Sequence, residues 1–183
     1  MTDAHSDTKP DNLLRGTRLL LLIITVIAAI AFVAIALGIP AMWLGRDWIA
    51  AEVAKEGTQH LLGTQSFAAI TVILLGCLVM VGMAIYFLRT LIAVIDSVGK
   101  GRAFTEENAV RLRSMGWTIL ASEALALMAV PIGPWLQASL PDGDVDIDFS
   151  VSLDAIITAL LLFILARIFR EGARMRDDLE GTV

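Results

Sequence analysis

Three ionisable side chains are placed where they could do chemistry within the apolar part of this chain. Glu123 stands well inside a long apolar run, and Arg89 and Arg167 stand near the ends of two others. A charge within a membrane span is costly, so such a group either serves a function or has a partner of opposite charge. Helical side chains lean toward the N-terminus of their helix. In spans of alternating direction, Glu123 and the arginines would lean toward one another, which predicts a Glu123–Arg167 or Glu123–Arg89 ion pair.

Patterns typical of enzymes are missing from the sequence. The two histidines, His5 and His60, fall in segments that the charge pattern below places on opposite sides of a membrane, so they form no metal or general-base cluster. The acidic stretch 142–148 lacks the glycine and the final glutamate of an EF-hand loop. Neither a phosphate-binding glycine loop nor a nucleophile motif is present. We expect a protein that is not an enzyme and that uses no cofactor or metal.

Four long apolar runs must position the three charged groups. Each has 21 or 22 residues, and the runs are 19–39, 67–88, 115–136 and 149–169. A helix of roughly 20 apolar residues crosses a hydrocarbon core of about 30 Å. With 57% apolar residues in the whole chain, the pattern predicts an all-α membrane protein, a bundle of four transmembrane helices. The membrane domain would span residues 13–176.

The positive charges are distributed unevenly between these runs. The N-terminal tail carries three Lys and Arg residues, the second loop with its flanks five, and the C-terminal end four. The first loop has only Arg46 and Lys55, and the third has none. Because positive loops stay in the cytoplasm, the pattern predicts a multi-pass membrane protein with both termini in the cytoplasm. Because acids and bases are segregated by side, the net charge of −5 is not informative about nucleic acid. We expect the lipid bilayer as one partner and no direct nucleic-acid partner, and a homo-oligomer is left open.

The segments outside the membrane carry three further signals. Residues 1–12 are polar and lack periodicity, as in a disordered cytoplasmic tail. Between the second and third spans, Gly99 is suited to end a helix and Thr105 to cap the next one, which predicts a cytoplasmic helical hairpin. Residues 144–154 alternate strictly between apolar and polar, which is typical of a short extracytoplasmic β-strand. If that strand forms, the fourth span starts near Asp154.

Two stretches resemble one protein family. They are residues 101–116 (GRAFTEENAVRLRSMG) and the last seven residues, 177–183 (DDLEGTV). Together with the four spans, they resemble the bacterial membrane proteins grouped as domain-of-unknown-function family 2975, over residues 14–183. Members of that family have no established activity and are often encoded beside a small helix-turn-helix regulator. The resemblance therefore implies a location in the bacterial inner (cytoplasmic) membrane and a cytoplasmic regulatory partner, and it supplies no catalytic residues.

Two hypotheses of function follow from the sequence. In the first, the chain is a non-enzymatic interaction or regulatory protein that engages a cytoplasmic partner through residues 99–116 and the tail 177–183. The candidate contacts are Phe104, Thr105, Asn108, Leu112, Arg113, Leu179 and Val183. In the alternative, the chain is a small transporter or proton-coupled carrier that uses Glu123, and it must oligomerise because four spans enclose little room for a pathway.

Overall fold

The computed structural model describes residues 12–55, 64–139 and 152–180, and every regular element in these ranges is a helix. The helices are α1 (Asn12–Leu44), α2 (Arg46–Lys55), α3 (Thr64–Gly99), α4 (Glu106–Ala129), the 3₁₀ turn η1 (Val130–Ile132), α5 (Gly133–Ser139) and α6 (Leu153–Glu180). The all-helical prediction is confirmed for the described residues.

Three helical stretches are long and apolar enough to cross a membrane: Arg15–Leu44, Thr64–Gly99 and Glu106–Trp135. The helix α6 is not among them, because its apolar part is bounded closely by Asp154 at one end and by Arg167 and Arg170 at the other. The membrane class predicted from the sequence therefore rests on three helices, and the fourth span is taken up below as a proposal.

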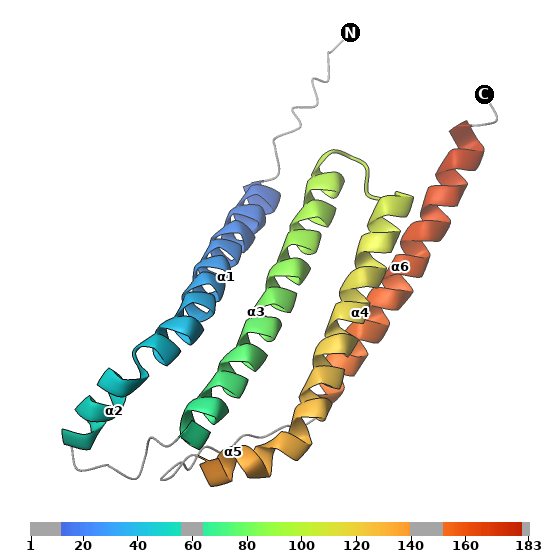
Figure 1. Ribbon diagram of the computed structural model, residues 1–183. Helices are drawn as coiled ribbons and strands as arrows, with labels where there is room; N and C mark the ends of the chain where they lie inside the picture. Colours follow the sequence, from blue (N-terminus) through green and yellow to red (C-terminus); the bar gives the residue numbers. More distant parts are fainter. Residues whose placement is uncertain (1–11, 56–63, 140–151, 181–183) are drawn as a thin grey trace.

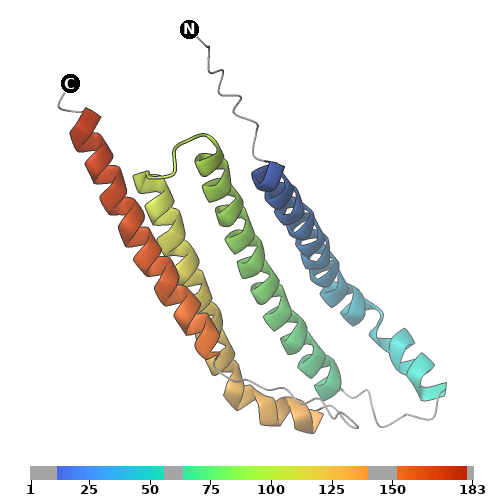
Figure 2. The ribbon, with the colours of Figure 1, turned by 180° about the vertical axis from the view of Figure 1, so that it is seen from behind.

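The four long helices lie side by side in the order α1, α3, α4, α6, with alternating direction (Figures 1 and 2). At one end lie the start of α1, the α3–α4 turn (residues 100–105) and the end of α6; we call this the hairpin end. At the other end, α2 continues from α1 and α5 turns aside from α4; we call this the loop end.

Helices α4 and α6 are held together by small residues that face aromatic rings. A Cβ atom added at Gly116 of α4 would lie 2.9 Å from the ring of Phe163 on α6. One added at Gly172 of α6 would lie 2.6 Å from the ring of Phe104. Between these two contacts lies a buried cluster of Leu112, Met115 and Ala166. The missing side chains let the two helices approach closely, as small residues do in membrane bundles.

Helices α1 and α3 are connected at both ends. At the hairpin end, the Arg18 guanidinium lies 2.8 Å from the Asp96 carboxylate. At the loop end, the Trp43 indole donates a hydrogen bond to the Thr71 hydroxyl, at 3.0 Å. These contacts fix the antiparallel register of the pair, which places the α1 apolar run alongside that of α3.

Two sequence predictions fall at the edges of the described ranges. Most of the predicted strand 144–154 lies outside the described residues; of its last residues, Ser152 precedes α6 and Leu153 and Asp154 belong to it. The predicted N-terminal tail also lies outside them, except that Asn12 begins α1. At the C-terminus, α6 continues to Glu180, so residues 177–180 of the predicted tail are helical.

Candidate functional site

The α3–α4 turn is built by backbone hydrogen bonds around one left-handed glycine. Gly101 has a φ of 71°, a conformation that glycine adopts without strain. The amides of Gly101 and Arg102 donate to the carbonyls of Val98 and Ser97, at 2.9 and 3.1 Å, which satisfies the last carbonyls of α3. The Ser97 hydroxyl donates to the carbonyl of Arg102 at 2.7 Å. The turn is therefore fixed to the end of α3.

Asn108 fixes the same turn to the start of α4. Its side chain is fully buried, and its amide nitrogen donates to the carbonyls of Arg102 and Ala103, at 3.2 and 2.9 Å. Its amide oxygen accepts from the Arg111 guanidinium at 2.9 Å. Its backbone N–H donates to the Thr105 hydroxyl at 3.2 Å, and Thr105 has the extended backbone of an N-cap, as the sequence predicted.

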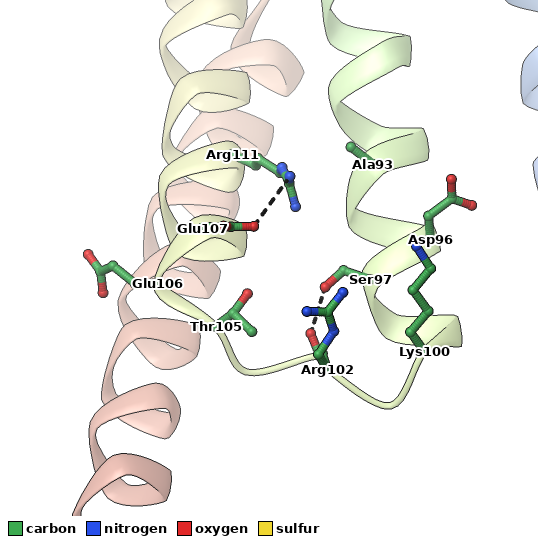
Figure 3. A pocket seen from close by; sticks show the side chains of 9 residues that line it. All are labelled: Ala93, Asp96, Ser97, Lys100, Arg102, Thr105, Glu106, Glu107 and Arg111. Carbon is green, nitrogen blue, oxygen red and sulfur yellow. Dashed lines mark hydrogen bonds and ion pairs between the residues drawn. The ribbon is translucent and has the colours of Figure 1, made fainter.

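A polar pocket of about 380 Å³ lies between the end of α3 and the start of α4 (Figure 3). It is lined by Ala93, Asp96, Ser97, Lys100, Arg102, Thr105, Glu106, Glu107 and Arg111. Arg111 extends from α4 toward α3 across the top of the pocket in this view. The lining brings cations, carboxylates and hydroxyl groups together at the hairpin end, where a polar ligand or a protein segment could bind.

The carboxylates of this pocket have partners, whereas two of its cations do not. Asp96 pairs with Arg18 at 2.8 Å and Glu106 with Arg170 at 3.2 Å, while Glu107 lies 3.6 Å from Arg111. Within the described ranges, neither Lys100 nor Arg102 forms an ion pair. The turn thus presents two exposed positive charges beside neutralised carboxylates.

The structure separates the predicted partner contacts into exposed and buried residues. Arg113 is exposed, and Phe104, 47% exposed, packs on Phe169 with ring centroids 5.1 Å apart. Asn108 and Leu112 are only 0% and 3% exposed: Asn108 holds the turn and Leu112 packs against α6.

The other three predicted contacts are Thr105, Leu179 and Val183. The Thr105 hydroxyl accepts a hydrogen bond from the α4 backbone, so it is engaged within the chain. Leu179 lies on the last turn of α6, and its side chain is outside the described part of the structure, as is Val183.

Glu123 belongs to α4, and its carboxylate lies beside the start of α6. Its carboxylate accepts a hydrogen bond from the Ser152 backbone N–H at 3.1 Å. Ser152 in turn accepts from the N–H of Ala155 at 3.4 Å, so it caps α6, and a negative charge beside a helix N-terminus is favourable. None of the ion pairs in the described ranges joins Glu123 to Arg89 or Arg167.

The axial register of the helices explains why this pair does not form. Gly116 faces Phe163; Glu123 lies seven residues from that contact in one direction and Arg167 four residues in the other. At 1.5 Å per residue, the two groups are about 16 Å apart along the helices.

The same argument applies to Arg89. Met83 and Thr118 line the same two grooves between α3 and α4, so they lie at one level. Arg89 is six residues from Met83 toward the hairpin end, and Glu123 is five residues from Thr118 toward the loop end. This again separates the groups by about 16 Å. Leaning side chains cannot close such a gap.

Several structural roles were missed by reasoning from the sequence. The pairs Arg18–Asp96 and Arg170–Glu106 join residues far apart in the chain, and no local spacing indicates them. Gly116 and Gly172 did carry a signal, because glycine inside a helix is unfavourable unless a close contact requires it. In the described ranges, no group of three His, Cys, Asp or Glu residues is placed to hold a metal ion.

The described residues form an antiparallel row of helices, three of them long and apolar enough to cross a membrane, which is the architecture of a helical membrane protein. The chain belongs to the family described as "Protein of unknown function (DUF2975)", whose model matches residues 43–183, more than half of the sequence. This confirms the resemblance seen in residues 101–116 and 177–183. No curated protein and no solved structure matches the chain.

Proposed function

We propose that this chain is a non-enzymatic protein of the bacterial inner membrane that engages a cytoplasmic regulatory protein through its hairpin end. The observation that carries the proposal is the pair of exposed cations, Lys100 and Arg102, on a turn that hydrogen bonds hold rigid. A preorganised surface loses little conformational entropy on binding. Its charge suits an acidic segment on the partner.

In this proposal α6 is the fourth span. Residues 153–169 make 17 helical residues, about 26 Å, which is close to the lower limit for a span. Asp154 lies in the first turn of α6, and Arg167 lies near its other end, where a long charged side chain can reach the interface. Large apolar side chains cover its outer face: Ile157, Leu160, Leu161, Ile164, Leu165 and Ile168. Such a surface is suited to lipid.

The distribution of Lys and Arg residues gives the orientation of the chain in the membrane. With four spans, the segments at the hairpin end hold 12 of the 14 Lys and Arg residues, and the loop end holds Arg46 and Lys55. The positive-inside rule then puts both termini and the α3–α4 turn in the cytoplasm. Lys100 is 11 residues beyond Arg89 on α3, about 16 Å, so the turn extends past the membrane surface toward a soluble partner.

The carrier hypothesis has less support from the geometry. It depends on Glu123 as a group free to exchange protons or bind an ion. In the structure this carboxylate accepts a backbone hydrogen bond at the start of α6, which gives it a structural role. A surface that binds a protein remains the function that more of the described contacts support.

Capture of cross-linked partners from native membranes tests the proposal. We expect the wild-type chain, tagged at the N-terminus, to retain a cytoplasmic protein, and the double variant Lys100→Glu/Arg102→Glu to lose it at least tenfold. The control is Arg46→Glu, which makes the same kind of charge reversal at the loop end, where Arg46 is partly exposed beside Asp47. Removal of residues 177–183 tests the tail and should also weaken capture.

The difference between the variants is the decisive result. Equal capture by the double variant and the wild type would contradict the proposal. So would a loss in Arg46→Glu that matches the loss in the double variant, because the hairpin end would then have no special part.

A further inference from the structure

Helices α3 and α4 leave a groove on each side of their line of contact. Met83 and Thr118 line both grooves and mark that line. The first groove, of about 570 Å³, is lined by Val79, Gly82, Met83, Tyr86, Ser114, Trp117, Thr118 and Ala121. The second, of about 350 Å³, is lined by Met80, Met83, Ala84, Phe87, Leu88, Thr118, Ile119 and Ser122. Both lie within the apolar stretches of the two helices.

The walls of the first groove are apolar in effect. The hydroxyl of Ser114 donates to the carbonyl of Arg111 at 2.7 Å, and that of Thr118 to the carbonyl of Ser114 at 2.9 Å. Both donors are thus used within α4. Tyr86, 51% exposed, is the lining residue of α3 nearest the hairpin end, as aromatic residues are near a membrane interface, and Trp117, 57% exposed, lies next to Thr118.

A cation stands next to the first groove. On α3, Tyr86 lines this groove and Ala93 lines the polar pocket at the hairpin end. Arg89 is three residues after Tyr86 and four before Ala93, so all three share one face of the helix. Arg89 is exposed, and it forms no ion pair within the described residues. Its side chain leans toward the N-terminus of α3, and therefore toward the groove.

The second groove has no such neighbour. The next turn of its face on α3 carries Leu91, which packs with Phe87 against the buried cluster of Leu112, Met115 and Ala166. The charge therefore distinguishes one groove from the other.

We propose that the first groove binds an acyl chain of an anionic phospholipid whose phosphate is bound by Arg89. The groove opens where lipid is the solvent, so its occupant is a lipid chain and not a water-soluble molecule. A guanidinium near the membrane interface needs an anionic partner, and the phosphate of a phospholipid supplies one at that depth. This site is separate from the protein contact at Lys100 and Arg102, so either proposal can fail without the other.

The test compares two arginine variants of the full chain in nanodiscs of phosphatidylcholine with increasing phosphatidylglycerol. We expect Arg89→Gln to bind phosphatidylglycerol about tenfold more weakly than the wild type, because it loses one charge-assisted contact. Arg167→Gln is the matched control: Arg167 is also exposed and without an ion pair in the described ranges, but it lies on α6, which contributes no residue to the groove lining. It should bind as the wild type does. Retained lipid is measured by native mass spectrometry.

A third variant separates the groove from the charge. Ala121→Phe places a ring in the first groove while Arg89 is intact, and it should displace the bound lipid. Equal lipid binding by Arg89→Gln and Arg167→Gln would overturn the proposal. So would unchanged binding in Ala121→Phe, competition by inorganic phosphate at the same concentration as the lipid, or a change from dimer to monomer in Ala121→Phe, which would identify a second copy as the occupant.

Discussion

Replacement of Gly116 by leucine is expected to separate α4 from α6. Gly116 is buried, and a Cβ atom there would lie 2.9, 3.1 and 3.2 Å from three atoms of the Phe163 ring. That ring has little freedom to move, because it packs edge-on against Trp117 with centroids 5.5 Å apart. The added atoms must force the helices apart. Such overpacking costs roughly 3 kcal/mol, and more where the backbone must shift.

A second glycine offers a matched control for this substitution. Gly76 lies within α3, is exposed, and has no atom within 4 Å of its added Cβ position. Gly76→Leu should leave the protein as stable as before or more stable by up to about 1 kcal/mol, since leucine favours a helix more than glycine does. Thermal unfolding in detergent, followed by tryptophan fluorescence, measures both. A Gly116→Leu protein as stable as Gly76→Leu would show that α4 and α6 do not pack as described.

Replacement of Asn108 by leucine is expected to release the α3–α4 turn. The carbonyls of Arg102 and Ala103 would each lose one of two donors, since the Ser97 hydroxyl and the Thr105 N–H remain, and Arg111 would lose an acceptor. Each lost hydrogen bond costs about 0.5–1.5 kcal/mol, and three are lost. We expect a loss of about 2–4 kcal/mol, together with faster tryptic cleavage after Lys100 and Arg102.

The control for the Asn108 substitution is made at Thr105, whose hydroxyl accepts a hydrogen bond from the Asn108 backbone. Thr105→Ala removes one hydrogen bond to the α4 N-terminus and should cost only about 1 kcal/mol. If Asn108→Leu is no less stable than Thr105→Ala and is cleaved no faster, then the Asn108 side chain does not hold the turn. In that case the rigidity invoked for partner binding would have no basis.

Much of the fold could be predicted because it depends on local sequence. The apolar runs fix where helices form, and Thr105 followed by two glutamates fixes where α4 begins. The contact surface could be predicted only in part. Asn108 and Leu112 are polar and apolar residues of one short helical stretch, and only the packing of α6 over that stretch decides that both are buried.

The predicted ion pair of Glu123 shows the same limit. The direction in which side chains lean is a property of each helix, and it was used correctly. The axial register between helices is set by tertiary contacts such as Gly116 with Phe163, which no local pattern reveals. Because Glu123 and the two arginines are displaced by about 16 Å along the helix axes, they are too far apart to form an ion pair. Glu123 instead accepts a hydrogen bond from the amide of Ser152, the residue before α6.

The labelling of single cysteines in spheroplasts tests directly whether the hairpin end is cytoplasmic and whether α6 crosses the membrane. The only native cysteine, Cys77, is exchanged for alanine, and one cysteine is placed at Asp47, Lys100 or Arg174, on α2, on the α3–α4 turn and near the end of α6. A membrane-impermeant maleimide should label position 47 in intact spheroplasts and positions 100 and 174 only after the membrane is opened. Labelling of position 100 from outside would contradict a cytoplasmic hairpin end, and labelling of position 174 from outside would show that α6 does not cross the membrane.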